Sequence, residues 1–389
     1  MKIAVFHHFL DNIGGAEIVT LTLARELNAD VYTTNIDPEK IIKMGFIDVL
    51  PRIKSIGKVP IKAPFRHQVT FWKFRRLNLK DKYDFYVIAG DWAVSGAVNN
   101  KPNLWYIHSP LNELWQWKDY VKQTILKKWQ RPIYDVWVVI NRFLSLKYSE
   151  HANIWVCNSK NTQGRVNKFY KHDAVVINPP TDTTKYKNNF DAGYWLSVNR
   201  LTAAKRIEIQ LQAFKKLEGK KLVIVGSYEK GARQFEEYKE KTKGILGDSD
   251  VEPGKEVNLA RKSEVEIIHW ADDVELKRLY AECTGFITTA MDEDFGMTVV
   301  EAMASGKPVI APNEGGYKES VADGETGILI NDIDADKLAK AIETIENNLK
   351  ENPDRYIKAC QDRAKQFDVK VFIEKIKNEI DDYFKNIQK

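Results

Sequence analysis

The stretch that decides the fold is Glu293–Ala311, which reads EDFGMTVVEAMASGKPVIA. A short apolar run, Gly285–Thr289, precedes it and predicts a buried strand, so Glu293 lies in the loop beyond that strand's carboxyl end. Met297–Ala304 has the spacing of a helix, and Pro308–Pro312 predicts the next strand. A strand, a loop, a helix and a second strand form one step of a parallel α/β sheet.

The loop and the start of this helix have the residue types of a ligand site. Open α/β sheets bind ligands at the carboxyl ends of their strands, and helix amides there suit a phosphate. Glu301, one turn into the helix, can accept both hydroxyls of a ribose, and Glu293 can accept hydroxyls of a sugar. An isolated glutamate is usually a solvated surface charge, but two around a glycine turn favour a binding site. The predicted ligand-binding residues of this stretch are Asp294, Phe295, Gly296, Met297, Thr298 and Glu301.

The same alternation of short strands and helices continues along both halves of the chain. We predict further strands at Lys2–His7, Val31–Thr34, Phe85–Ala89, Leu104–His108, Ile154–Cys157, Val175–Asn178, Tyr194–Asn199, Lys221–Gly226, Val265–His269 and Thr326–Ile330. Regular structure stops at Asn178–Pro180, where two prolines follow one another. Strands that alternate with helices on both sides of this break predict two doubly wound, parallel sheets.

These patterns set the expected domain boundaries. Residues 1–182 form the first domain, together with a final amphipathic helix at 369–389, and residues 193–366 form the second. Residues 228–255 are charged and without a strand pattern, which predicts a helix and a surface excursion.

Composition excludes several classes of protein. The chain has 389 residues, of which 43% are hydrophobic and 29% charged, as in a soluble globular enzyme. No apolar run approaches the roughly 18 residues that span a bilayer, and the first residues turn polar too soon for a secretory signal. Three scattered cysteines argue against a disulfide framework and a structural zinc site and suit a reducing compartment, so we expect a cytoplasmic protein.

Charge is divided unevenly between the two halves. Residues 1–180 hold 26 Lys and Arg against 15 Asp and Glu, whereas the remaining residues hold 33 against 39. Eight of the ten tryptophans also lie in the first half. A basic, tryptophan-rich half joined to an acidic one indicates that the two halves face different partners.

Glu293 and Glu301, separated by seven residues with Phe295-Gly296 between them, resemble the signature of glycosyltransferase family 4. Residues 194–206, YWLSVNRLTAAKR, are similar to that family's strand, Arg, four residues, Lys segment. Two further segments fit the pattern of the family. Gly315 to Gly327 resembles the family's paired-glycine segment, and Gly226 matches the end of the family's second strand. Several spaced motifs in the right order make the resemblance specific over residues 194–330.

The resemblance implies the GT-B fold, in which two Rossmann-like domains face each other across a cleft and the last helix crosses back to the first domain. It also implies transfer of a sugar from a nucleotide donor, with retention of the anomeric configuration and no bound metal. Protein cations must then neutralise the leaving diphosphate, and Arg200 and Lys205 can do so at the end of a strand. Alone, both would be ordinary surface charges.

The first domain offers weaker candidates. Gly14-Gly15-Ala16-Glu17 resembles the family's N-terminal glycine loop, which borders the donor phosphates and the acceptor, although a plain turn is the alternative. Tyr106–Pro110 resembles a segment of the family that places His108 against the donor sugar; the alternative is a packed or capping histidine. The residues expected on the acceptor side are Glu17, Asp91 and Asp11.

Residues 111–117, LNELWQW, resemble the mannosyltransferases that build lipid-linked glycans. The resemblance implies GDP-mannose, or another nucleoside-diphosphate hexose, as the donor and a glycan or polyprenyl-linked acceptor. Retention has two possible routes. In front-face substitution the departing phosphate oxygen takes the acceptor's proton, while double displacement would use Glu293 as the nucleophile. We favour the first route, with Arg200, Lys205, Glu293 and His108 as the catalytic residues.

Two basic stretches, Lys54–Lys82 and Tyr120–Arg142, are interleaved with Trp and Phe. Such stretches suit an anionic membrane surface, which predicts a peripheral protein on the cytoplasmic membrane face. A plain helical face of a soluble domain is the alternative. No nucleic-acid motif accompanies the charge, so we expect no nucleic-acid partner.

Two other functions remain open at this point. A sugar-nucleotide epimerase of the same fold would use acid–base pairs and need no acceptor. A non-catalytic nucleotide-sugar-binding protein would be expected to lack Lys205, Glu293 or Glu301, and all three are present. A classical dinucleotide dehydrogenase is disfavoured, because no GxGxxG follows either first strand.

Overall fold

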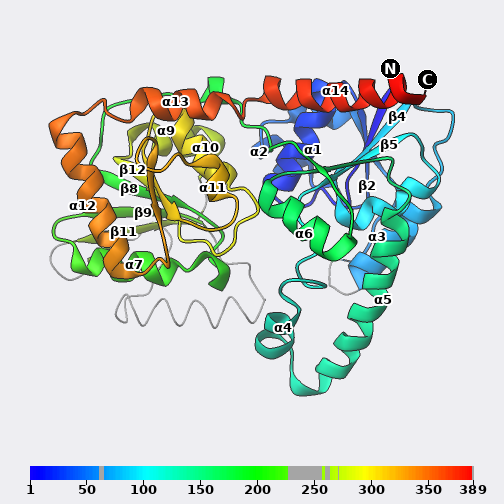
Figure 1. Cartoon of the computed structure of the whole chain (residues 1–389), viewed down its shortest axis with the longest axis horizontal. Helices are drawn as coiled ribbons and strands as arrows, with labels where there is room; N and C mark the ends of the chain where they lie inside the picture. The colour runs from blue at the N-terminus through cyan, green and yellow to red at the C-terminus, as the bar shows by residue number, and fades with distance from the viewer. Residues whose placement is uncertain (61–64, 227–255, 259–262, 270, 388–389) are drawn as a thin grey trace. The chain divides into compact units, whose positions relative to one another are not determined.

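The protein is described from a computed structural model, shown in Figure 1. The description covers residues 1–60, 65–226, 256–258, 263–269 and 271–387, so the excursion predicted at 228–255 lies outside the described residues. The chain divides into two compact units. The first comprises Met1–Pro180 and Val369–Lys389, and the second comprises Thr181–Asp368.

The first unit is built on a seven-stranded parallel sheet in the order β3-β2-β1-β4-β5-β6-β7. Its strands are β1 (Ile3–Phe6), β2 (Asp30–Thr33), β3 (Ile53–Ser55), β4 (Phe85–Ile88), β5 (Asn103–Ile107), β6 (Ile154–Cys157) and β7 (Val175–Val176). Every residue of β1, β4, β5 and β6 is buried, as expected for strands covered on both faces. The order reverses between β1 and β4, where loops diverge and leave room for ligands.

Helices surround this sheet and fill the connections between its strands (Figure 1). They are α1 (Gly15–Glu26), α2 (Pro38–Lys43), α3 (Phe65–Arg76), α4 (Lys118–Tyr120), α5 (Arg131–Ser149), α6 (Lys160–Tyr170) and α14 (Val369–Ile387). The last helix, α14, buries Phe372, Ile376 and Ile380. The Phe372 ring meets the Tyr106 ring of β5 at 5.7 Å, so the chain's end returns to the first unit, as predicted.

The second unit repeats the plan with the order β10-β11-β9-β8-β12-β13-β14. Its strands are β8 (Tyr194–Val198), β9 (Lys221–Val225), β10 (Glu256–Asn258), β11 (Glu264–Ile268), β12 (Gly285–Ile287), β13 (Val309–Pro312) and β14 (Gly327–Ile330). Its helices are α7 (Ile207–Lys216), α9 (Asp273–Glu282), α10 (Met297–Ala304), α11 (Tyr317–Ser320), α12 (Ala335–Glu351) and α13 (Ile357–Lys365). Their apolar faces enclose one core around Trp195, Phe214 and Phe286.

The predicted fold class is confirmed, with one correction. The second sheet is not wholly parallel, because β10 pairs antiparallel with β11. Edge positions accept such a strand since they lack a crossover helix on that side. The sequence patterns also missed β3 and α13, a three-residue strand and a short helix that carry little periodic signal.

Candidate active site

The strand order of the second unit reverses between β8 and β12, which are hydrogen-bonded neighbours. The loops that leave the carboxyl ends of such strands turn to opposite faces of the sheet, and ligands bind between them. Arg200 and Lys205 follow β8, and Glu293 follows β12. The topology therefore brings residues from two distant parts of the sequence to one edge.

Lys205 and Glu293 form an ion pair at this edge. The Lys205 Nζ donates to Glu293 Oε2 at 2.5 Å, and both side chains are partly buried, with 21% and 27% exposed. Two of the predicted catalytic residues are thus in direct contact. The arrangement presents a cation for phosphate and a carboxylate for sugar hydroxyls side by side.

Backbone contacts fix the segment of Lys205 against the segment after β12. Met291 N–H donates to the Ala204 carbonyl at 2.8 Å, and the Thr289 hydroxyl donates to the Lys205 carbonyl at 2.7 Å. These bonds hold the two loops together independently of the ion pair. The positions of Lys205 and Glu293 are therefore set by the main chain.

Arg206 is a positioning residue that sequence reasoning missed. It adopts a left-handed conformation with a φ of 49°, which costs about 1–3 kcal/mol in a residue other than glycine. Its Nε donates to the Thr289 carbonyl at 2.6 Å, and its guanidinium pairs with Glu314. These contacts offset the strain and tie α7 to the end of β12.

The loop of Glu293 lies against the paired glycines. Gly316 N–H donates to the Glu293 carbonyl at 2.8 Å, and a Cβ on Gly316 would lie 2.4 Å from the Asp294 carbonyl oxygen. Gly296 has a φ of +89°, and a Cβ there would lie 2.5 Å from the Tyr317 ring. Both glycines permit a close approach that no other residue allows. The buried Phe295 side chain anchors the same loop.

Glu301 on α10 is held by a tyrosine that the sequence did not single out. Tyr280 of α9 donates its hydroxyl to Glu301 Oε2 at 2.8 Å. Burial raises the pKa of Glu301. A carboxylate has about four acceptor positions, so one phenol donor leaves room for two further donors, such as the vicinal hydroxyls of a ribose.

The remaining predicted residues of this unit border the same edge. Met297 and Thr298 open α10, where first-turn amides have no acceptor within the helix. Gly226 follows β9, and a Cβ there would lie 1.9 Å from the Asn199 carbonyl oxygen, so the chain passes close to the end of β8. Arg200 is exposed, and no described residue pairs with its guanidinium. It is therefore available to a ligand anion.

In the first unit, polar residues follow three adjacent strands. His7 comes after β1, Asp91 after β4 and His108 after β5. His7 Nδ1 and His108 Nε2 lie 3.1 Å and 2.8 Å from the carbonyl oxygen of Ala89. The topology thus gathers His7, His108 and Asp91 at the carboxyl edge of this sheet.

Burial lowers the pKa of His108 to about 3 and that of His7 to about 4. Both rings are therefore neutral near pH 7. Because the His108 Nε2–H donates to Ala89, its Nδ1 is the acceptor atom, able to receive a hydrogen bond from a hydroxyl.

The glycine loop and the acceptor-side candidates lie in the same unit. Gly14 caps α1, Gly15 begins it, and the Glu17 carboxylate of its first turn lies 2.7 Å from where a Gly14 Cβ would be. Asp11 is ion-paired with Arg66, which leaves its carboxylate less open to a ligand than predicted. Asp91 directly follows Gly90 at the end of β4.

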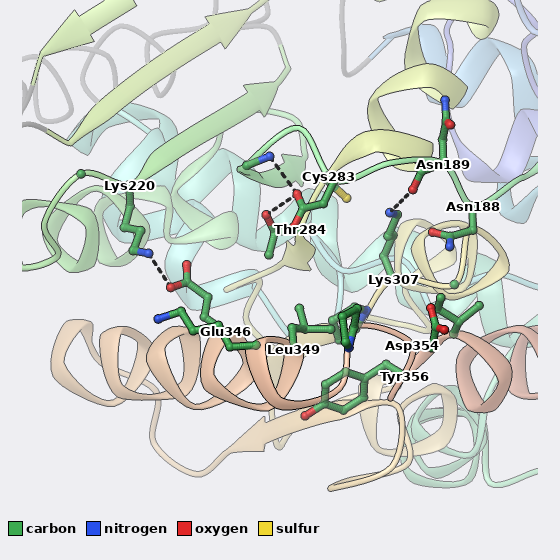
Figure 2. A pocket seen from close by; sticks show the side chains of 18 residues that line it. Asn188, Asn189, Lys220, Cys283, Thr284, Lys307, Glu346, Leu349, Asp354 and Tyr356 are labelled. Carbon is green, nitrogen blue, oxygen red and sulfur yellow. Dashed lines mark hydrogen bonds and ion pairs between the residues drawn. The ribbon is translucent and has the colours of Figure 1, made fainter.

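A cavity of about 500 Å³ lies elsewhere in the second unit (Figure 2). Gly193, Lys220, Thr284 and Pro308 line it, and each stands just before a strand, at the amino edge of the sheet. Lys220 pairs with Glu346 at 2.5 Å inside it. This cavity contains none of the predicted site residues.

Comparison with known proteins identifies the chemistry. Residues 180–363 match the family model of group 1 glycosyl transferases. The chain is 27% identical to an alpha-1,3/1,6-mannosyltransferase of Candida glabrata, over 92% of this chain and 87% of that protein. A relative from Neurospora crassa, whose name gives the same activity, is 25% identical, over 90% of this chain and 83% of that protein. Residues 180–363 thus carry the group 1 glycosyl transferase domain, and the chain is a glycosyltransferase. The predicted family and enzyme class are confirmed.

Solved structures confirm the fold of this glycosyltransferase. Anabaena Alr3699/HepE, in complex with UDP and glucose, matches with a TM-score of 0.73 and 19% identity, over 98% of this chain and 99% of that one. Sucrose-phosphate synthase from Thermosynechococcus elongatus matches with a TM-score of 0.72 and 18% identity, over 99% of each. Both extend over the two units, so the likeness covers the whole fold.

Proposed function

We propose that this glycosyltransferase moves mannose from GDP-mannose, or a related hexose from another nucleoside diphosphate, to a glycan or polyprenyl-linked acceptor. The transfer retains the anomeric configuration and needs no metal ion. The observation that carries the proposal is the Lys205–Glu293 ion pair at the point where the strand order reverses. The names of the relatives favour mannose.

The site residues of the second unit each bind one part of the donor. Arg200 and Lys205 hold the diphosphate together with the first-turn amides of α10. Glu293 accepts hydroxyls of the hexose, and Glu301 accepts the two ribose hydroxyls at the positions that Tyr280 leaves open. The pairing of Lys205 with Glu293 compensates both charges.

The chemical step is a front-face substitution. The bond between the anomeric carbon and the diphosphate oxygen breaks, and the acceptor oxygen forms the new bond on the same face. The acceptor's proton passes to the departing phosphate oxygen. Arg200 and Lys205 stabilise the charge that develops there, which is where a preorganised donor contributes most. Neutral His108 accepts a hydrogen bond from a sugar hydroxyl through Nδ1.

The acceptor and the location follow from the first unit. We infer that it binds the acceptor, with Glu17 on the acceptor side and Gly14 and Gly15 at the border between the donor phosphates and the acceptor. We also infer that the protein works on the cytoplasmic face of an anionic membrane. Support comes from the basic charge of residues 1–180. No described helix combines the length and the apolarity needed to cross a bilayer.

A two-stage experiment tests the activity. Thermal shifts with GDP-mannose, UDP-glucose and other nucleotide sugars identify the donor, because a specific ligand raises the melting temperature according to its affinity. Transfer to a short-chain lipid phosphate is then followed by NMR, with retention at the anomeric carbon as the expected result. Conversion of the donor without an acceptor would instead support an epimerase, and an inverted product would exclude the proposed step.

A further inference from the structure

Helix α5 packs on the first unit along one of its faces. This inward face contacts that unit through Val138, Tyr148 and the Trp137 ring, which lies 6.3 Å from the Trp92 ring. With α4, its amino-terminal part extends away from the sheet of that unit (Figure 1). The apolar face of a surface helix normally turns towards the core.

The outward face of α5 carries large apolar side chains that no described residue covers. Ile133, Val136, Val139, Ile140 and Phe143 are exposed by 63%, 62%, 67%, 52% and 62%. Their spacing of three and four residues places them on one side of the helix. Trp129, just before α5, is 66% exposed. We call these six residues the α5 stripe. Single exposed apolar residues are ordinary, but a contiguous group of this size marks an interaction surface.

Cations stand at both ends of the stripe. Lys127 and Lys128 precede Trp129 and are exposed, and the Lys147 Nζ lies 5.8 Å from the Phe143 ring centre. Residues 118–147 hold seven Lys and Arg against two Asp and Glu. One of the two acids, Asp135, is already paired with Lys122 at 2.5 Å. The surroundings of the stripe are therefore strongly positive.

We propose that the α5 stripe inserts into the surface of an anionic bilayer, with its flanking lysines on the lipid headgroups. The pattern of apolar side chains bracketed by basic and aromatic ones is that of helices lying in the membrane interface. From Ile133 to Phe143 the helix is roughly 15 Å long, well below the roughly 30 Å of a bilayer core, so it lies along the surface.

A second copy of the chain fits this face less well. In a two-fold symmetric pair the same surface meets itself. An antiparallel pairing of two stripes would set Lys127 and Lys128 against Lys147 of the other copy, at both ends. Like charges there oppose association, whereas anionic headgroups attract them.

The inference deepens the proposed placement at a membrane and rests on it, and it narrows the contact to the second of the two predicted stretches, Tyr120–Arg142, and the part of α5 that follows it. Of the aromatic residues that the sequence predicted in Lys54–Lys82, Phe71 and Phe74 are buried in the core of the first unit. Trp72 and Phe65 remain exposed, by 45% and 70%. The main apolar contact surface is α5, whose aliphatic residues the sequence pattern did not single out.

Flotation with vesicles of phosphatidylcholine and phosphatidylglycerol in equal parts tests the proposal. The full chain is compared with a Val136→Asp/Ile140→Asp variant, and with Val274→Asp as the matched control, since Val274 is an apolar residue of α9 that is 78% exposed. We expect the double variant to lose at least tenfold in bound fraction with an unchanged melting temperature. The control should bind like the parent.

Two further measurements separate this inference from the proposed function. Cys157, Cys283 and Cys360 are all buried, so Val139→Cys can be labelled with a polarity-sensitive dye, whose emission should shift to the blue on vesicles. Transfer to a water-soluble acceptor should be equal in the parent and the double variant. Vesicle binding by the double variant at the parent's level would overturn the inference. It would also be overturned if the parent formed a dimer that dissociates in the double variant, while vesicles left the emission of the dye on Val139→Cys unchanged. Absence of transfer by every variant, with stripe-dependent binding intact, would contradict the proposed function alone.

Discussion

Lys205 and Glu293 lie 88 residues apart in the sequence, and their side chains meet at 2.5 Å at the carboxyl edge of the second sheet. The contact depends on the strand order, because β8 and β12 are neighbours although β9, β10 and β11 separate them along the chain. A cation and a carboxylate thus lie side by side at this edge. In the proposed function the diphosphate binds Lys205 and the hexose binds Glu293.

Replacement of the lysine tests the charge at the diphosphate. Lys205→Ala should lower turnover about 100-fold or more, as loss of one preorganised donor to a developing charge usually does. Lys216→Ala is the matched control, since Lys216 forms an ion pair of the same 2.5 Å with Asp336 on the surface. Steady-state kinetics measure both. Normal turnover by Lys205→Ala would rule out its proposed role.

Replacement of the carboxylate should separate nucleotide binding from transfer. Glu293→Gln keeps the shape of the side chain but frees Lys205 from its ion pair, so free nucleoside diphosphate should bind at least as tightly as to the parent. Transfer should fall about 100-fold, because the contact with the hexose is weakened. Calorimetric titration with GDP, beside turnover, checks this. A parallel loss of nucleotide affinity would show that Glu293 acts on the nucleotide instead.

The hydroxyl of Tyr280 should control the pH dependence of donor binding. Burial raises the pKa of Glu301, and its protonated form cannot accept from both ribose hydroxyls, so affinity should fall as the pH drops towards that raised pKa. Tyr280→Phe removes a donor that stabilises the carboxylate, so the fall should begin at a higher pH. Tyr194→Phe, which removes a hydroxyl bound to the Leu279 carbonyl, is the control. Identical profiles for all three proteins would contradict the assignment.

His108 should stay neutral throughout the working range. Its pKa is lowered to about 3, so its ring should not titrate between about pH 5 and pH 8, where an ordinary histidine does. NMR of histidine-labelled protein, with the resonance assigned by a His108→Gln variant, measures this. A titration near the ordinary value would mean that the ring is solvated and charged near neutral pH.

Two glycines of similar φ allow the cost of backbone strain to be measured apart from the cost of a clash between an added Cβ and a neighbouring side chain. Gly324 has a φ of +79° with nothing within 4 Å of an added Cβ, whereas Gly296 has a φ of +89° and the Tyr317 ring at 2.5 Å. Gly324→Ala should cost about 1 kcal/mol of unfolding free energy, and Gly296→Ala should cost about 3 kcal/mol. Denaturant unfolding of both variants tests this, and equal losses would contradict the packing of Gly296 on Tyr317.

The residues with a local pattern were predictable from the sequence. Gly285–Thr289 and Met297–Ala304 predicted β12 and α10, and the family motif then indicated Lys205 and Glu293. The residues that complete the site carry no such pattern. Tyr280 hydrogen-bonds Glu301 from a different helix, and an arginine in a left-handed conformation has no signal in the sequence. The exposed apolar face of α5 could not be predicted either, because apolar residues at helical spacing predict a face that packs on the core.

A structure of the protein with GDP-mannose bound tests the central claim most directly. We expect the diphosphate within hydrogen-bonding distance of Arg200 and Lys205, the hexose hydroxyls on Glu293 and the ribose on Glu301. A donor bound at the amino edge of the sheet, in the cavity of Figure 2, with the Lys205–Glu293 ion pair undisturbed, would contradict it.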